Sequence, residues 1–194
     1  MSGGQGHVET AQLGGVGEDF PARAWPDMVT LYGGAGIREL CGELQDVFDA
    51  DIPLLLFLVL ADRAGMSADA LHLGVLIRSA TEWRVAAVKP LRALRTTLLE
   101  SCRDPAESAF LDKIKHMELE AERLEVDRLA RAFLPSTDAG RSLTALYLSE
   151  LCVPSHHAAA ARARIDAALA AMPTRMTVPS GSGQPNTTSG GHHG

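Results

Sequence analysis

The chain has 194 residues, of which 46% are hydrophobic and 22% are charged, and its formal net charge is -6 at pH 7. This composition is typical of a globular protein and supplies enough apolar residues for a packed core. The acidic balance disfavours a nucleic-acid surface, because phosphate binding depends on clustered lysine and arginine. Cys41, Cys102 and Cys152 show no CxxC spacing, so we interpret them as reduced thiols of a cytosolic protein.

The two ends of the chain differ in composition from its middle. Residues 1–19 are glycine-rich, and residues 173–194 are dominated by proline, glycine, serine and threonine, so both are expected to be disordered tails. The first ten residues, MSGGQGHVET, contain neither the basic start nor the apolar run of a secretory signal. The strongest apolar run, residues 52–61, is about half of the ~20 residues that a membrane span needs. We therefore expect a cytoplasmic protein without a membrane span, with a single helical domain at residues 20–172.

Helical spacing of apolar residues organises that domain. It predicts helices at residues 20–32, 37–48, 52–64, 68–101, 106–134, 143–151 and 156–172. The helix at 52–64 is apolar nearly all round and should be the most buried. The helix at 68–101 contains Pro90, which lacks an N–H and clashes with the carbonyl of Ala86, so a kink is expected. The prediction is an all-α fold, a compact multi-helix bundle with one long kinked helix.

Several of these helices carry an apolar stripe that is expected to face the core. In the first helix Trp25, Val29 and Tyr32 fall at helical spacing. In the helix at 68–101 it comprises Leu73, Leu76, Ile77, Ala80, Trp83, Ala87, Leu91, Leu94 and Leu98. In the helix at 106–134 it comprises Phe110, Ile114, Met117, Ala121, Leu124 and Ala132.

Charged residues flank two of these stripes. Arg84 and Arg95 border the stripe of the helix at 68–101, and Arg92 lies further round that helix. Glu118 and Glu125 border the stripe of the helix at 106–134, and Glu122 lies just beyond them. A buried unpaired charge is costly, so the first interpretation is a set of Arg–Glu pairs between the two helices. The alternative is an arginine cluster that receives a carboxylate or phosphate. The candidate ligand-binding residues are Trp83, Arg84, Arg92, Arg95, Glu118 and Glu122, although Trp83 is interpreted first as a core aromatic.

Motifs of known chemistry are otherwise absent from the sequence. There is no GxSxG, no P-loop and no GxGxxG after a strand, so no catalytic residue and no cofactor is predicted. Asp112, His116 and Glu120 recur at i, i+4 and i+8 and leave a carboxylate–histidine metal site as a remote alternative. A solvated charged face explains them better, because the paired Glu-x-x-His motifs of di-iron bundles are missing. No metal is predicted.

Several spaced motifs resemble a bacterial, largely proteobacterial family of small conserved proteins with a domain of unknown function. They are Tyr32 with Gly36; Leu44, Gln45 and Asp46; Asp51 before Leu54, Leu55, Leu56 and Phe57; Trp83 and Arg84; Pro90, Leu91 and Arg92 with Arg95; and Glu118 and Leu119 with Ala121, Glu122 and Arg123. The resemblance covers about residues 25–133. It implies a small cytosolic helical protein and supplies no activity, substrate or cofactor.

The leading functional hypothesis is a non-enzymatic protein-interaction module, because an amphipathic helical core occurs without a catalytic constellation. The alternative is a site for an anionic small molecule, or an enzymatic pocket, between the helices at 68–101 and 106–134. The sequence leaves the partner and the oligomeric state open.

Overall fold

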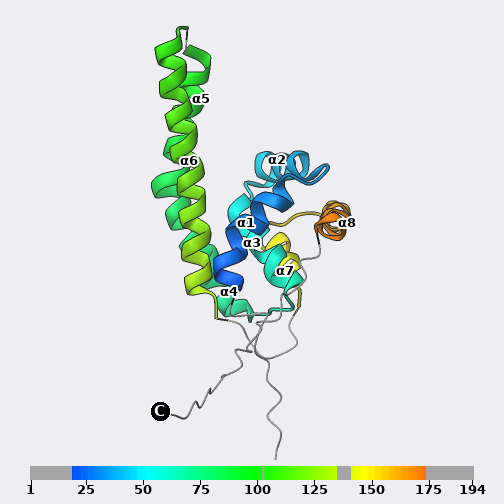
Figure 1. Ribbon diagram of the computed structural model, residues 1–194. Helices are drawn as coiled ribbons and strands as arrows, with labels where there is room; N and C mark the ends of the chain where they lie inside the picture. The colour runs from blue at the N-terminus through cyan, green and yellow to red at the C-terminus, as the bar shows by residue number, and fades with distance from the viewer. Residues whose placement is uncertain (1–18, 102, 135–140, 174–194) are drawn as a thin grey trace, which may run out of the picture.

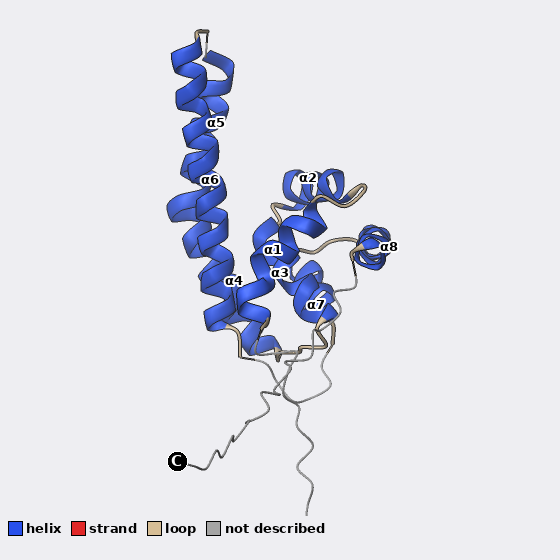
Figure 2. Cartoon of the chain, viewed as in Figure 1, coloured by secondary structure: helices blue, strands red, loops and turns tan. Residues whose placement is uncertain are grey.

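The computed structural model describes residues 19–101, 103–134 and 141–173, and these residues form helices without strands (Figure 2). The helices are α1 (Phe20–Tyr32), α2 (Ile37–Phe48), α3 (Ile52–Arg63), α4 (Ala70–Trp83), the π-helix η1 (Arg84–Val88), α5 (Lys89–Ser101), α6 (Pro105–Ala132), α7 (Leu143–Glu150) and α8 (Ser155–Ala171). The all-α class is confirmed. The expected tails lie, apart from Asp19 and Pro173, outside the described residues.

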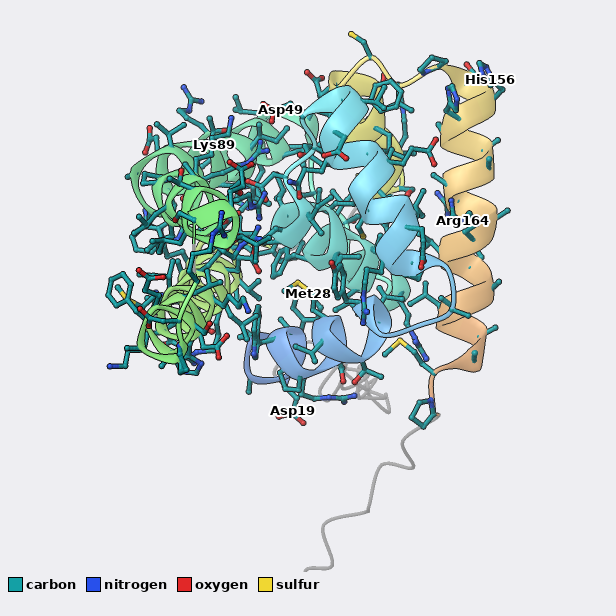
Figure 3. The ribbon with its side chains drawn as sticks, turned by 90° about the horizontal axis from the view of Figure 1, so that it is seen from above. Asp19, Met28, Asp49, Lys89, His156 and Arg164 are labelled. Carbon is teal, nitrogen blue, oxygen red and sulfur yellow. The ribbon has the colours of Figure 1, made fainter. Side chains whose placement is uncertain are left out.

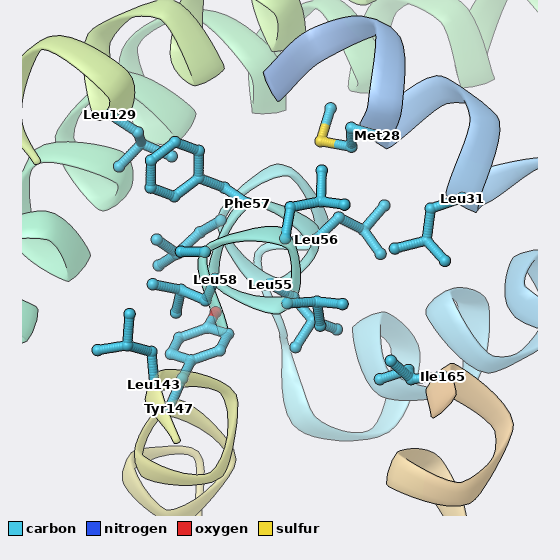
Figure 4. Packing of buried hydrophobic residues seen from close by; sticks show 14 of the residues in the cluster. Met28, Leu31, Leu55, Leu56, Phe57, Leu58, Leu129, Leu143, Tyr147 and Ile165 are labelled. Atoms are coloured by element: carbon cyan, nitrogen blue, oxygen red, sulfur yellow. The ribbon is translucent and has the colours of Figure 1, made fainter. Parts of the chain in front are cut away.

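Helix α3 is the centre of the fold, as its sequence predicts. All nine residues from Pro53 to Ala61 are buried. Its side chains radiate to several partners, with Phe57 pointing toward Leu129 of α6 and Leu56 toward Met28 of α1 (Figure 4). Because α3 is apolar all round, every neighbouring helix can bury a stripe against it. None of the described helices has both the length and the apolar character that crossing a membrane requires.

The irregularity expected at Pro90 is present, and it takes the form of the π-helix η1. The backbone N–H of Lys89 donates to the carbonyl of Arg84, five residues earlier. Proline cannot donate and collides with the carbonyl four residues before it, so a local change to i→i−5 bonding accommodates the ring. The chain then continues as α5. The long predicted helix is therefore a run of α4, η1 and α5.

Helices α5 and α6 form a long hairpin that extends beyond the other helices (Figure 1). The main core cluster contains no described residue between positions 81 and 125, and α5 has no fully buried residue. Only the C-terminal part of α6, including Val126 and Leu129, joins the core. The outer part of the hairpin must therefore be held by contacts other than the main core.

Two of the predicted apolar stripes are wrong in phase. In α1 the buried residues are Phe20, Ala24, Met28 and Leu31, whereas Val29 and Tyr32 are exposed and Trp25 is half-buried. In α6 the buried residues are Leu111, Ile114, Glu118, Ala121, Glu125, Val126, Leu129 and Ala130. Phe110, Met117 and Leu124 are exposed. Two glutamates occupy the buried face of α6. Because hydrophobicity alone does not assign glutamates to a core, it predicts a buried face about one quarter-turn from the observed one.

The C-terminal helices attach to the body through polar contacts as well as apolar ones. The carboxylate of Asp62 accepts hydrogen bonds from the backbone N–H groups of Leu143 and Thr144, at 2.7 and 3.0 Å, and so caps the start of α7. Helix α8 buries only Ala161, Ile165 and Ala168, in keeping with its alanine-rich sequence. Both helices lie on the side of α3 away from the α5–α6 hairpin (Figure 1).

A buried pair of carboxyl groups joins α3 to α6. Oδ1 of Asp51 caps α3 by accepting the N–H of Leu54, and the backbone N–H of Asp51 donates to the hydroxyl of Tyr147 at 2.8 Å. Glu125 is 1% exposed. Its two carboxyl oxygens and Oδ2 of Asp51 are buried and receive no hydrogen bond from an N–H group or a hydroxyl group of the described residues. Burial, and then the neighbouring Asp51 carboxylate, raise the pKa of Glu125 to about 10. Glu125 is therefore protonated at neutral pH, and a hydrogen bond from its carboxyl O–H to Asp51 pairs two of these three oxygens.

This proton predicts an unusual dependence of stability on pH. The folded chain keeps the Glu125 proton above the ordinary glutamate pKa, whereas the unfolded chain releases it, so stability falls as pH rises. Between about pH 5 and pH 8 this single proton lowers the free energy of unfolding by up to ~1.4 kcal/mol per pH unit. In Glu125→Gln, whose amide is neutral at every pH, that slope should largely disappear from urea-unfolding curves. Glu120→Gln, on the exposed face, should keep the pH-dependent slope. Equal slopes in the native protein, Glu125→Gln and Glu120→Gln would contradict a proton shared by Glu125 and Asp51.

Candidate functional site

An ion-pair network holds α5 against α6. Nε of Arg92 lies 2.9 Å from Oε1 of Glu118, and its Nη2 lies 2.8 Å from Oε1 of Glu122. Nε of Arg95 lies 2.5 Å from Oε2 of Glu118. The Glu118 side chain is only 10% exposed, so it is shielded from water and receives both arginines. The interhelical Arg–Glu pairing expected from the sequence is confirmed for these residues.

Arg84 does not join this network. Its guanidinium donates to the carbonyl oxygen and the carboxylate of Asp49, at 2.8 and 2.7 Å, and Nζ of Lys89 lies 3.3 Å from the same carboxylate. Asp49 ends α2 in the left-handed conformation, which aspartate tolerates better than most residues. Although burial raises the pKa of Asp49, the two cations lower it overall. The contact ties the end of α2 to the start of the hairpin (Figure 3).

Trp83 joins α4 to α6. Its indole Nε1 donates to the carbonyl oxygen of Ala121 at 2.9 Å, and the guanidinium of Arg128 lies 5.1 Å from its ring centroid. The indole thus has a polar partner and a cation on its face within the chain. This arrangement matches the first interpretation of Trp83, a packed aromatic residue.

A cavity of about 270 Å³ lies between the first three helices and the hairpin. We call it the α1–α6 cavity. Its lining is mostly apolar and consists of Trp25, Met28, Val29, Tyr32, Cys41, Gly42, Gln45, Ile52, Pro53, Leu56, Arg92, Leu119 and Glu122. Of the six candidate residues, Arg92 and Glu122 line this cavity. The sequence predicts a site between the helices at 68–101 and 106–134; these helices contribute Arg92, Leu119 and Glu122 to the cavity wall, and α1, α2 and α3 supply the rest.

The polar groups of this lining fall into two sets. Arg92 and Glu122 already bind each other across the wall. The indole N–H of Trp25, the hydroxyl of Tyr32 and the side-chain amide of Gln45 make no hydrogen bond to another described residue. An apolar cavity with a few free hydrogen-bonding groups is the usual form of a small-molecule site.

Ionisable side chains of the lining have shifted pKa values. Burial raises the pKa of the Cys41 thiol to about 12, so this sulfur is protonated at neutral pH and is a poor nucleophile. Burial also raises the pKa of Glu122, with Arg92 opposing and Glu118 reinforcing that shift. The described lining includes no histidine or serine to serve as an activated nucleophile–base pair.

Other hollows and the metal alternative are less well supported. A hollow of about 620 Å³ between α7 and α8 has a lining dominated by small residues, including Ala145, Ser149 and Ala159.

Asp112 pairs with Lys115 and Glu120 pairs with Arg123 on the exposed face of α6. Within the described ranges, no three histidine, cysteine or acidic side chains gather in a way that could hold a metal ion.

Sequence reasoning missed most of this cavity. Trp25 and Tyr32 recur at helical spacing and are therefore expected in the core, but both line the cavity, and Trp25 also packs against the main core cluster. Gly42 could have served as a signal, because a glycine inside an amphipathic helix lowers helix stability and calls for a reason. Gln45 could have served as another, since it borders the apolar stripe of α2.

The network predicts a clear contrast between two glutamates of α6. Glu118→Gln removes the charge that holds Arg92 and Arg95, and we expect a loss of about 2 kcal/mol in the free energy of unfolding, between the values for buried and surface pairs. Glu120→Gln breaks an exposed pair two residues away and should change stability little. Urea unfolding followed by circular dichroism measures both. Equal effects of the two substitutions would show that the network does not stabilise the fold.

Comparison with known proteins gives a family and no activity. Residues 23–129 match the family model described as a protein of unknown function, DUF2390. Neither the curated proteins nor the solved structures contain a match to this chain. The matched segment includes the whole lining of the α1–α6 cavity and the Arg92 network. Because the match spans more than half of the sequence, the chain belongs to the DUF2390 family of proteins of unknown function.

Proposed function

We propose that the protein is a non-enzymatic binding protein whose α1–α6 cavity holds a small, uncharged and mostly apolar molecule. The observation that carries the proposal is the lining of the cavity: apolar walls combined with polar groups on Trp25, Tyr32 and Gln45 that have no hydrogen-bond partner among the described residues. A molecule with an aromatic or branched aliphatic body and one hydrogen-bonding end satisfies both parts of this lining.

Charge in the cavity wall argues for an uncharged ligand. Arg92 is the cation of the lining, and it already binds Glu118 and Glu122. An anion that displaced either carboxylate would leave a partly buried glutamate without its partner, which is costly. The anionic ligand considered from the sequence is therefore less favoured than a neutral one.

The glycine at position 42 supports the proposal that the cavity is kept open. A Cβ added to Gly42 would meet no atom within 4 Å, so steric crowding does not require glycine at this position of α2. Glycine inside a helix costs about 0.5–1 kcal/mol relative to alanine. We infer that the missing side chain leaves room for the ligand.

The family resemblance adds to the proposal. Tyr32, Gln45, Arg92, Leu119 and Glu122 belong to the spaced motifs on which that resemblance rests, and all five line the α1–α6 cavity. The non-enzymatic assignment rests on the protonated Cys41 thiol and on a lining that offers no other activated nucleophile. A cytoplasmic location remains a prediction.

A protein-interaction module is the second candidate function. It is favoured by the side of α6 that faces away from the cavity, where large apolar side chains are exposed to solvent. The two functions use different surfaces and can be tested separately.

Filling the cavity tests the proposed ligand site. A neutral solvatochromic probe, 6-propionyl-2-dimethylaminonaphthalene, should bind the native protein with a blue shift of its emission. In Gly42→Leu the new side chain occupies the cavity, and we expect at least about a tenfold loss of affinity, which corresponds to 1.4 kcal/mol. The variant should remain folded, because leucine is a better helix former than glycine.

Gly74→Leu is the matched control, since Gly74 also lies within a helix, also has no atom within 4 Å of an added Cβ, and is not part of the cavity lining. It should bind the probe as the native protein does. Absence of probe binding to the native protein, or equal binding by both glycine variants, would refute the ligand site.

A further inference from the structure

We propose that the outer face of α6 binds the same face of a second copy of this chain in an antiparallel arrangement. The outer face consists of Phe110, Met117 and Leu124, which are 50%, 53% and 37% exposed. It is independent of the α1–α6 cavity, because none of these residues lines that cavity.

The spacing of these residues fits a partner helix. Phe110, Met117 and Leu124 recur every seven residues, so they form one stripe that extends for roughly 20 Å along the helix at 1.5 Å per residue. The hairpin that carries them extends beyond the other helices, so its outer part is accessible (Figure 1). Half-exposed phenylalanine and methionine side chains along such a stripe are typical of a helix–helix interface.

The symmetry of the stripe identifies a second copy as the partner. Phe110 and Leu124 lie equally far from Met117, on opposite sides of it. A two-fold axis at Met117 therefore packs Phe110 of each chain against Leu124 of the other and brings the two Met117 side chains together. This self-complementarity is the property that a two-fold symmetric interface requires.

Charge follows the same symmetry. Lys113 lies four residues before Met117, and Glu120 lies three residues after it, beside the outer face. In the antiparallel arrangement Lys113 of each chain approaches Glu120 of the other, twice per dimer. Lys113 forms no ion pair with another described residue, and Glu120 pairs only with the exposed Arg123. Opposite charges at these positions favour the antiparallel dimer over other packings.

Sedimentation equilibrium of the full-length chain tests the proposal. The native protein should show a concentration-dependent equilibrium between monomer and dimer, and Met117→Glu should abolish the dimer. Leu71→Glu is the matched control, because Leu71 is an exposed leucine of α4 outside the stripe. Circular dichroism should show the same helical content in both variants.

A charge exchange tests the antiparallel register. Lys113→Glu and Glu120→Lys should each weaken the dimer at least about fivefold, and the double variant should recover most of the native affinity. Gly42→Leu should leave the dimer unchanged, which separates this interface from the ligand site. A native protein that is monomeric at every concentration tested, or a dimer that survives Met117→Glu, would overturn the proposal; a double variant weaker than both single variants would also overturn it.

Discussion

The ion pairs of Arg92 and Arg95 with Glu118 and Glu122 are the constraint on which the hairpin and the cavity depend. Helix α5 has no fully buried residue, so apolar packing against the main core does not hold it. The network fixes α5 on α6 and also places Arg92 and Glu122 in the cavity wall. Because these charges neutralise each other, the contacts that stabilise the hairpin are also the reason for proposing an uncharged ligand.

Helix α6 separates the two proposed binding surfaces. One side carries Leu119 and Glu122, which line the α1–α6 cavity, and the opposite side carries Met117 and Leu124, which are exposed. The buried carboxyl groups lie between these sides. In each case a polar partner is supplied: Glu118 binds arginines, and Glu125 shares a proton with Asp51. The helix can therefore be buried on a face that is only partly apolar.

Helix positions could be predicted because local signals agreed with tertiary packing. The apolar run that includes Phe57 required burial on all sides, Asp51 is an N-cap, and Pro90 required a break in regular α-helical bonding. The ion-pair network was also predictable in part, since arginines beside one apolar stripe need acidic partners. The pairing of Arg84 with Asp49 could not be predicted, because it depends on where the end of α2 lies in space.

The phase of α6 could not be predicted from hydrophobicity. Glu118 and Glu125 appear polar in sequence, and their burial depends on Arg92, Arg95 and Asp51, which are distant in the chain. A stripe through Met117 is the more apolar choice, although it is the exposed one. For the same reason the cavity was missed, since its lining comes from five helices and no single helix shows it.

Because the charge of Arg92 is used within the protein, we propose that the α1–α6 cavity takes a neutral ligand. Titration of the full-length protein with two probes of matched shape, 2-naphthylmethanol and 2-naphthoate, tests it directly by calorimetry. We expect the alcohol to bind more tightly than the carboxylate, and Gly42→Leu to remove this binding. Tighter binding of 2-naphthoate, lost on Arg92→Gln, would show instead that Arg92 is available to an anion.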